Sequence, residues 1–556
     1  MPEILDQFGA PMSSDMRAYE AAEFGRELAE WSPTLSSADS DIAYEKDTLD
    51  ARSLDAARND GYVVGGRNIH ADNIVGDQFK LSAKPNVTLL QRVDSRLDRE
   101  WAQEFSSVAE ARFGLWAESP DCYVDVRRKR TFTELVRASY LSVFDAGDSL
   151  ATFEWHKNAG PNKTQVRLVE TSRLSNPYGQ QDSLTLRQGI KLNRHGAEMG
   201  YHIRRAQTGD AFDPANIHTW DYVPRYKRWG RLNASYIALL DRPEQTRAVG
   251  ELVSILKTIK SCKKFRDIQL ERAALNAMYA ATLETDLPPQ AAFEKVGVDV
   301  VKNGVQGEEQ VPWPNYYARQ VANYNKAAGN LRFNGVKMPA LPPGTKLKLN
   351  TANGIDSVGS DFEVSMLRYL SSALKLPYEQ FARDFTQTSY SSARFSSIDT
   401  WKFFATRKRM VPAKFATQIY TAWLEEEMSL NRLPMPANAP SYWDQKDAYA
   451  GCGWVGAGRG QIDPVKETQG SAMRLGLNMS TLEKECANYD GSDWQEVLLQ
   501  KAREKEYMNE LGITENDIKI KGISNTSDAD QQKQMPQSKE SAESFSLEIN
   551  PLPKTA

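Results

Sequence analysis

A run of cations is the first feature of this 556-residue sequence that could do chemistry. Five basic residues follow one another with no acid between them: Lys257, Lys260, Lys263, Lys264 and Arg266. A lysine is a point charge on a flexible stem, which suits loose, sliding contact with phosphates better than fixed recognition. The competing interpretation, which we weight slightly more, is a solvated helix face or one that pairs with acids of a neighbouring subunit.

A second candidate is a polar segment that carries hydroxyls and an amide but no charge. It consists of Thr386, Gln387, Thr388, Ser389, Tyr390, Ser391 and Ser392, with Arg394 two positions further on. Such a surface can touch a polyanion without trapping it, because no cation in it neutralises a phosphate. The alternative is an ordinary solvated loop.

Motifs for enzyme chemistry are missing from the sequence. It has no GxxxxGK[ST] phosphate loop and no GxSxG nucleophile elbow, and the glycine cluster Gly456–Gly460 lacks the Lys-Ser/Thr ending. The acidic pairs Asp39/Asp41 and Asp145/Asp148 lie in turn-like stretches and are interpreted as solvated surface. We therefore expect neither a catalytic site nor a cofactor.

The metal-binding and redox residues are also scattered. The five histidines form no HExxH, and none of the four cysteines lies in a CxxC pair. These cysteines, Cys122, Cys262, Cys452 and Cys486, are expected to be reduced thiols. We expect no metal site.

Several elements are predicted to position the two candidate surfaces. The length indicates two to four domains. Apolar spacing predicts helices over Tyr62–Val75, Leu97–Trp116 and Arg130–Phe144. Strand and turn are expected over Asp77–Leu90. Residues 150–220 are expected to form one antiparallel sheet, which with the helices makes an α+β domain.

The second half of the chain is predicted to be mostly helical. A helix of about 35 residues is expected to start near Ser235, because no proline occurs between Pro243 and Pro288. A proline-rich module is expected over 285–350. Further helices are predicted over 361–374, over 396–430 with one break at Pro412, and over 463–511. Residues 433–460 are expected to be loop, and 522–556 to be disordered. The fold class is thus α+β, mostly helical.

No apolar run of membrane-spanning length occurs, and the first 15 residues do not resemble a secretory signal. The protein is therefore expected to stay in the cytosol where it is made.

A series of short motifs carries a family resemblance. They are Asn68–Gly76, Asp221–Arg225, Leu341–Thr345, Pro377–Glu379, Tyr390–Arg394, Arg432–Pro434 and Gly458–Glu467. Each motif is weak alone, but their order from about Ala51 to Leu511 resembles the lambda-like family of bacteriophage portal proteins, the head-tail connectors. The match around Trp229–Asn233 is only approximate.

The resemblance implies a portal fold that assembles into a ring, usually of twelve copies. It implies an N-terminal arm (1–56), an α+β wing (57–240), a stem helix (241–285), a clip (286–355), a second stem helix (356–380) and a tunnel loop (381–395). A long wing helix with its loop (396–460), a helical crown (461–515) and a disordered tail (516–556) complete the chain.

The resemblance also implies partners and a location. Double-stranded DNA would pass through the ring, with the tunnel loop facing it. The clip would meet the terminase large subunit during packaging and the head-completion or tail connector proteins afterwards. The major capsid protein would surround the ring at the portal vertex of the virion, after assembly in the host cytoplasm. A net charge of −4 suits passage of DNA better than capture.

Two rival classes remain open at this point. An enzyme acting on DNA would need a metal or nucleotide site, and another phage minor capsid or head-completion protein would form no channel. A purified ring with a central hole would indicate a portal, cleavage activity an enzyme, and a monomer the other structural protein.

Overall fold

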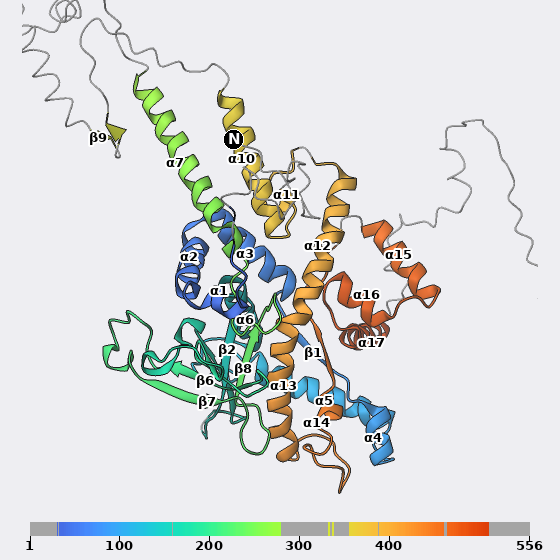
Figure 1. Ribbon diagram of the computed structural model, residues 1–556. Coiled ribbons are helices and arrows are strands. Elements are labelled where there is room, and N and C mark those ends of the chain that lie inside the picture. Colours follow the sequence, from blue (N-terminus) through green and yellow to red (C-terminus); the bar gives the residue numbers. More distant parts are fainter. Residues whose placement is uncertain are drawn as a thin grey trace, which may run out of the picture. The chain divides into compact units, whose positions relative to one another are not determined.

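The computed structural model describes residues 31, 33–157, 159–279, 332–333, 336–337, 355–386, 388–460 and 464–510 (Figure 1). A boundary after Gly491 divides the chain into two compact units. The second unit contains α17 (Trp494–Glu510), and all other described elements belong to the first. Helices and antiparallel sheets occur together, which confirms the α+β, mostly helical fold class.

A two-part rod runs through the first unit (Figure 1). It consists of α12 (Tyr390–Met410) and α13 (Pro412–Ser429), which meet at the break that the sequence predicts. Pro412 begins α13, where its missing N–H costs nothing. The second part is buried on most sides, and Tyr420 and Trp423 are among the largest fully buried side chains.

An aromatic cluster surrounds α13. The ring of Phe113 lies 5.1 Å from that of Phe132 and 5.2 Å from that of Trp423, both edge to face. Phe113 belongs to α5 (Arg99–Ala117) and Phe132 to α6 (Phe132–Ala146). Together with α3 (Gly61–Ile74), these helices confirm the three that apolar spacing predicts.

Gly147 shows why α6 ends where it does. Its φ of 84° is in the left-handed region, and a Cβ there would meet the backbone of Val249 at 2.5 Å. Only glycine allows this approach, so the chain can turn directly from α6 into the strand β2 (Asp148–Trp155).

The single sheet predicted for residues 150–220 is wrong, because the strands form two sheets. One has the order β3-β2-β8 and the other β4-β5-β6-β7, all antiparallel. The strands are β2 (Asp148–Trp155), β3 (Thr164–Val169), β4 (Leu186–Arg187), β5 (Ile190–Leu192), β6 (Glu198–Arg204), β7 (Trp220–Pro224) and β8 (Ala234–Ala238). Apolar residues of both sheets share one cluster, so each sheet buries a face against the other.

The start predicted for the long helix is also wrong. Ser235, Tyr236 and Ile237 pair with β2 as part of β8, and α7 (Leu256–Tyr279) begins about twenty residues later. A short buried apolar run has the same composition in a strand as in a helix, so spacing could not separate them. The described helix has 24 residues; the residues before it form β8, turns and a 3-10 helix (Val253–Ile255), and those after Tyr279 lie outside the described part of the chain.

Helix α10 (Ile355–Ala373) lies beside α7, where the rings of Phe265 and Phe362 are 5.1 Å apart (Figure 1). The proline-rich module between them lies outside the described residues except for the short strands β9 (Arg332–Phe333) and β10 (Val336–Lys337), which pair. The predicted disordered tail also lies outside them.

The remaining elements complete the first unit. They are α1 (Ala38–Ala43), α2 (Lys46–Asn59), β1 (Lys80–Ala83), α4 (Val87–Val93), α11 (Tyr378–Ala382), α14 (Lys446–Tyr449), β11 (Cys452–Val455), α15 (Pro464–Gly476) and α16 (Leu482–Tyr489). The strand expected after residue 77 is present as β1, but its partner β11 and α14 lie in the stretch predicted as loop. No described helix is both long and apolar enough to cross a membrane.

Three consecutive carboxylates at the end of α13, Glu425, Glu426 and Glu427, are buried and attach the helix to the start of β3 and its neighbours. Glu426 accepts hydrogen bonds from the backbone N–H groups of Lys163 (2.7 Å) and Thr164 (2.9 Å) and from the Thr164 hydroxyl (2.6 Å). Its neighbour Glu427, 1% exposed, pairs with Arg112 and accepts from Asn162. Burial raises the pKa of Glu425, opposed by its ion pair with Arg231.

We predict that Glu426→Ala lowers the free energy of unfolding by about 2–4 kcal/mol, because three donors lose their acceptor in a buried site. Glu426→Gln should lose less, since an amide oxygen still accepts. Urea unfolding and amide exchange of β3 measure both effects. The control is Glu104→Ala on exposed α5 surface, which should change stability by less than about 0.5 kcal/mol. If Glu426→Ala and Glu104→Ala lowered the free energy of unfolding equally, the hydrogen bonds of Glu426 would not hold α13 against β3.

Candidate functional site

The predicted basic run divides into two groups in the structure. Lys257, Lys260 and Lys264 are exposed on one side of α7. Lys263 donates to the backbone oxygen of Asn59 at 3.2 Å. Arg266 pairs with Asp60 and Glu363 and lies over the Tyr62 ring, so its charge is used to hold α7 against α3 and α10.

A groove of about 1040 Å³ accompanies the exposed lysines. Lys257, Lys260 and Lys263 of α7 line one wall, whereas Lys264 does not line the groove. The other wall, on or beside α2, includes Asp47, Asp55 and Asp60 together with Arg52. Charges of opposite sign therefore face the same opening. Both interpretations of the basic run therefore stay open: the lysines can pair with acids of a neighbouring subunit, or they can contact phosphates.

The polar segment lies between α11 and α12. Its loop part is short, because residues 390–394 already belong to the first turns of α12. Ser389 caps that helix by accepting from the N–H of Ser392 (3.3 Å). Thr386 donates its N–H and hydroxyl to Asp384, which lowers the pKa of that carboxyl.

The exposure of this segment differs along its length. Thr386, Ser389, Ser391 and Ser392 are exposed, and Thr388 and Arg394 are half-buried. Gln387 and the side chain of Tyr390 lie outside what the structure describes. The segment therefore presents hydroxyl groups to solvent next to one carboxylate, that of Asp384.

His70 fixes the base of α10 close to the polar segment. Its ring nitrogens lie 2.9 Å from the backbone oxygen of Leu374 and 3.2 Å from the hydroxyl of Tyr140. Burial lowers the pKa of His70 to about 4, so the ring is neutral at pH 7. The sequence analysis missed this contact, since a single histidine with no motif gives no signal.

The interpretation of the acidic pairs as solvated surface is wrong for three of the four residues. Asp39, Asp145 and Asp148 are buried. Asp148 pairs with Arg247 at 2.5 Å, and Asp145 accepts a bidentate contact from Arg67. Local sequence shows only that these acids lie near turns, whereas distant cations make their burial possible.

The buried acids of the described part of the chain are not metal ligands. Among the described residues, no group of three or more His, Cys, Asp or Glu side chains could hold a metal ion. None of the four cysteines forms a disulfide.

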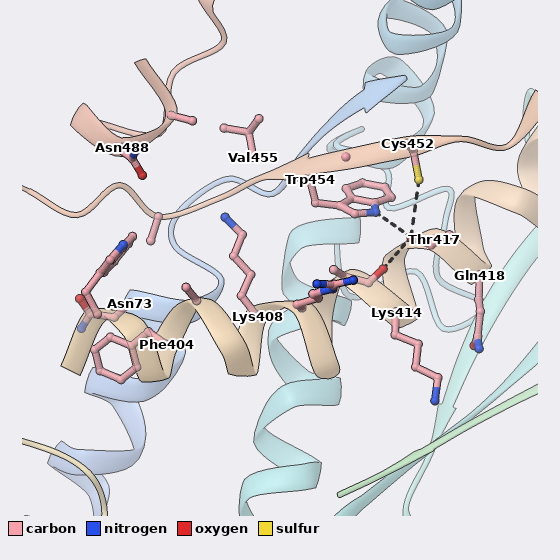
Figure 2. Close-up of a pocket in the computed structure, with 17 residues that line it drawn as sticks. Asn73, Phe404, Lys408, Lys414, Thr417, Gln418, Cys452, Trp454, Val455 and Asn488 are labelled. Carbon is pink, nitrogen blue, oxygen red and sulfur yellow. Dashed lines mark hydrogen bonds between the residues drawn. The ribbon is translucent and has the colours of Figure 1, made fainter. Parts of the chain in front are cut away.

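A cationic pocket that the sequence analysis missed lies between α12, α13, β11 and the end of α16 (Figure 2). Its volume is about 640 Å³, and Trp401, Phe404 and Trp454 contribute aromatic walls. Lys408, Arg409 and Lys414 also line it, and no carboxylate is among the described residues that do. The only sequence signal is the basic triplet 407–409.

Lys408 gives this pocket its chemistry. Burial lowers the pKa of Lys408 to about 8, and its ammonium group lies 5.7 Å from the centre of the Phe79 ring. Trp454 donates to the Thr417 hydroxyl at 3.0 Å, which fixes the wall opposite (Figure 2). The lysine therefore stays mostly charged at pH 7, and an anionic group entering the pocket would raise its pKa again.

The glycine cluster Gly456–Gly460 has a packing role at its first position. A strand, β11, does precede it, contrary to our expectation. A Cβ on Gly456 would meet the backbone oxygen of Val75 at 2.8 Å. The close approach to the end of α3 therefore explains this glycine without a phosphate.

Comparisons with known proteins agree with the resemblance. The chain is 33% identical over 510 residues to "Portal protein B" of Escherichia phage lambda, covering 91% of this chain and 92% of that protein. It is 33% identical over 494 residues to "Portal protein" of Escherichia phage N15, covering 88% and 90%.

Solved structures give weaker likenesses. The neck of a native gene transfer agent particle matches 77% of this chain and 100% of that chain with 11% identity and a TM-score of 0.31. The virion of the native particle matches 69% and 92% with 12% identity and a TM-score of 0.29. We draw no conclusion from scores this low.

The family model described as phage portal protein, lambda family, matches residues 24–408, which include α7, α10, the polar segment and all of α12 except its last two residues. With two relatives at 33% identity over about nine tenths of the chain, the protein belongs to the lambda family of phage portal proteins.

Proposed function

We propose that this chain is the subunit of a closed ring, of twelve copies, that forms the channel for double-stranded DNA at one vertex of a phage capsid. The observation that carries the proposal is the end-to-end similarity to the portal proteins of phages lambda and N15. A ring requires heterologous contacts whose rotation closes. The paired α7 and α10 supply rods that copies can pack side by side.

The proposed parts follow the described elements. Helices α1 and α2 belong to the N-terminal arm, and the helices from α3 to α6 with the two sheets make the wing. Helices α7 and α10 make the stem, α12 and α13 the long wing helix, and α15 to α17 the crown. The residues of the clip lie outside the described part of the chain except for β9 and β10. The short loop before α12 is the tunnel loop.

The proposed mechanism is passive. The exposed hydroxyls of the tunnel loop touch the duplex without holding it, and Asp384 beside them repels phosphates. The energy comes from the terminase large subunit, which would dock on the clip, and head-completion or tail connector proteins would later take its place. The major capsid protein would surround the wing in the virion. We propose no enzymatic activity and no cofactor.

We predict that the purified protein forms rings with a central hole, of a mass corresponding to twelve copies of a 62.5 kDa chain. Negative-stain microscopy and light scattering measure this. A protein that stayed monomeric, or that cleaved DNA or hydrolysed ATP alone, would contradict the portal proposal.

A shorter tunnel loop should impair DNA retention without affecting the ring. We predict that deleting residues 387–388, which leaves the Ser389 cap in place, reduces the amount of DNA retained in filled heads. The control Ser389→Ala removes the cap and costs about 1 kcal/mol without shortening the loop. If the deletion variant retained DNA as the unaltered protein does, the tunnel-loop assignment would be wrong.

The exposed stem lysines should affect packaging through charge alone. We predict that replacing Lys257, Lys260 and Lys264 by Gln changes the packaging rate and its salt dependence, with unfolding unchanged. The matched control replaces three exposed wing lysines, Lys129, Lys157 and Lys227, by Gln. Identical rates for both triple variants would show that the stem lysines are merely solvated.

A further inference from the structure

The four-stranded sheet of the wing has one covered and one uncovered face. Ile190, Tyr201 and Ile203 are buried on the covered face, within the cluster shared with the other sheet. Side chains alternate between the two faces of a strand. The neighbours of these three residues therefore point to the opposite side, against which no other described element packs a hydrophobic cluster.

That outer face combines cations with aromatic rings. Arg204 lies 5.4 Å from the centre of the Trp220 ring, and Lys191 lies 5.4 Å from that of Tyr222. The ring of His202 lies 5.0 Å from that of Tyr222. The register pairs Arg204 with Trp220 and His202 with Tyr222, so all five side chains belong to one surface.

A strained aromatic residue extends this surface. Tyr178 has φ 53° and ψ 31°, a left-handed conformation that costs an ordinary residue about 1–2 kcal/mol. It is nevertheless 76% exposed, and its ring lies 5.3 Å from that of Trp220. The few contacts of the exposed Tyr178 side chain stabilise the fold too little to offset this backbone strain. The strain therefore indicates that the ring makes a further contact with a partner.

The outer face favours an anionic partner with aromatic or apolar groups. Among the described residues of β5, β6 and β7 that point outward, none is acidic. The acids on these strands are engaged elsewhere, Asp221 with Arg205 and Glu198 with Arg225. Complementary charge across a contact selects the partner, and aromatic faces add area.

The first 30 residues of this chain have the matching chemistry. They contain seven carboxylates and two arginines, a net charge of −5, whereas the whole chain has −4. The other 526 residues together therefore have a net charge of +1. Phe8, Tyr19 and Phe24 lie among these acids and can stack on the rings of the outer face.

The chain enters the described part next to this sheet. Arg242 donates to the backbone oxygen of Ser36, and Asp39 of α1 pairs with Arg187 of the edge strand β4. A pocket between α1 and residues 174–188 is lined by Ser37 and Leu184. Thirty residues can extend to about 100 Å, so the outer face lies well within their reach.

We propose that the acidic segment of residues 1–30 docks on the outer face of β5, β6 and β7. Its carboxylates pair with Lys191 and Arg204, and its aromatic residues pack on Tyr178, Trp220 and Tyr222. The contact does not depend on ring formation, because both parts belong to the same chain.

The test compares full-length proteins by the reactivity of lysine side chains toward acetic anhydride, measured by mass spectrometry. One variant has all seven acids of the segment replaced by Asn or Gln. We expect Lys191 to react at least three-fold faster in this variant than in the unaltered chain, and high salt to reduce the difference. Lys129, exposed elsewhere on the wing, should react equally in both.

A synthetic peptide of residues 1–30 supplies the second arm. Added to the neutralised variant, it should protect Lys191 again. Binding of the labelled peptide should weaken at least ten-fold when Trp220→Ala and Arg204→Glu are added, but not with the control Lys129→Glu and Lys227→Glu. Equal Lys191 reactivity in all proteins would overturn the proposal. So would protection by a 30-nucleotide DNA strand but not by the peptide, which would make nucleic acid the ligand.

Discussion

Three adjacent carboxylates on a buried helix end need donors that local sequence cannot supply. Glu425, Glu426 and Glu427 obtain them from three separate segments, through Arg231, through Asn162 and Thr164, and through Arg112. A buried carboxylate left unpaired would cost several kcal/mol, so these segments must assemble together. The end of α13 therefore joins the long rod to α5 and to the three-stranded sheet β3-β2-β8.

Asp148 holds the N-terminal helix α2 in place in the same way, as a buried carboxylate with cations from distant segments. It is fully buried between Arg247 and Lys46, and Tyr236 donates to it at 3.0 Å. Helices α7 and α10 are held by other contacts: Arg266 of α7 pairs with Asp60 and with Glu363 of α10, and His70 contacts the backbone oxygen of Leu374 just after α10.

The charges of the protein are consistent with a conduit. The buried cations Lys46, Arg231 and Arg247 are paired within the fold, and the exposed Lys257 and Lys260 face a groove that also contains acids. The cationic pocket around Lys408 and the outer face of the wing sheet are separate features, each able to hold an anion. The protein thus concentrates its capacity for anions at defined sites, whereas residues 386–392 carry no cation, as the proposed passage of DNA would require.

The sequence determined the helices with clear apolar spacing, the break at Pro412, the α+β class and, through collinear motifs, the family. Only the tertiary structure decided that the strands form two sheets, that Ser235–Ile237 is strand, and that Asp39, Asp145 and Asp148 are buried. It also separated Arg266, paired with Asp60, from the exposed lysines beside it. Helical periodicity and proline act over a few residues, so sequence shows them. Burial of a charge depends on a partner a hundred residues away, as Arg247 is from Asp148, and only folding brings the two together.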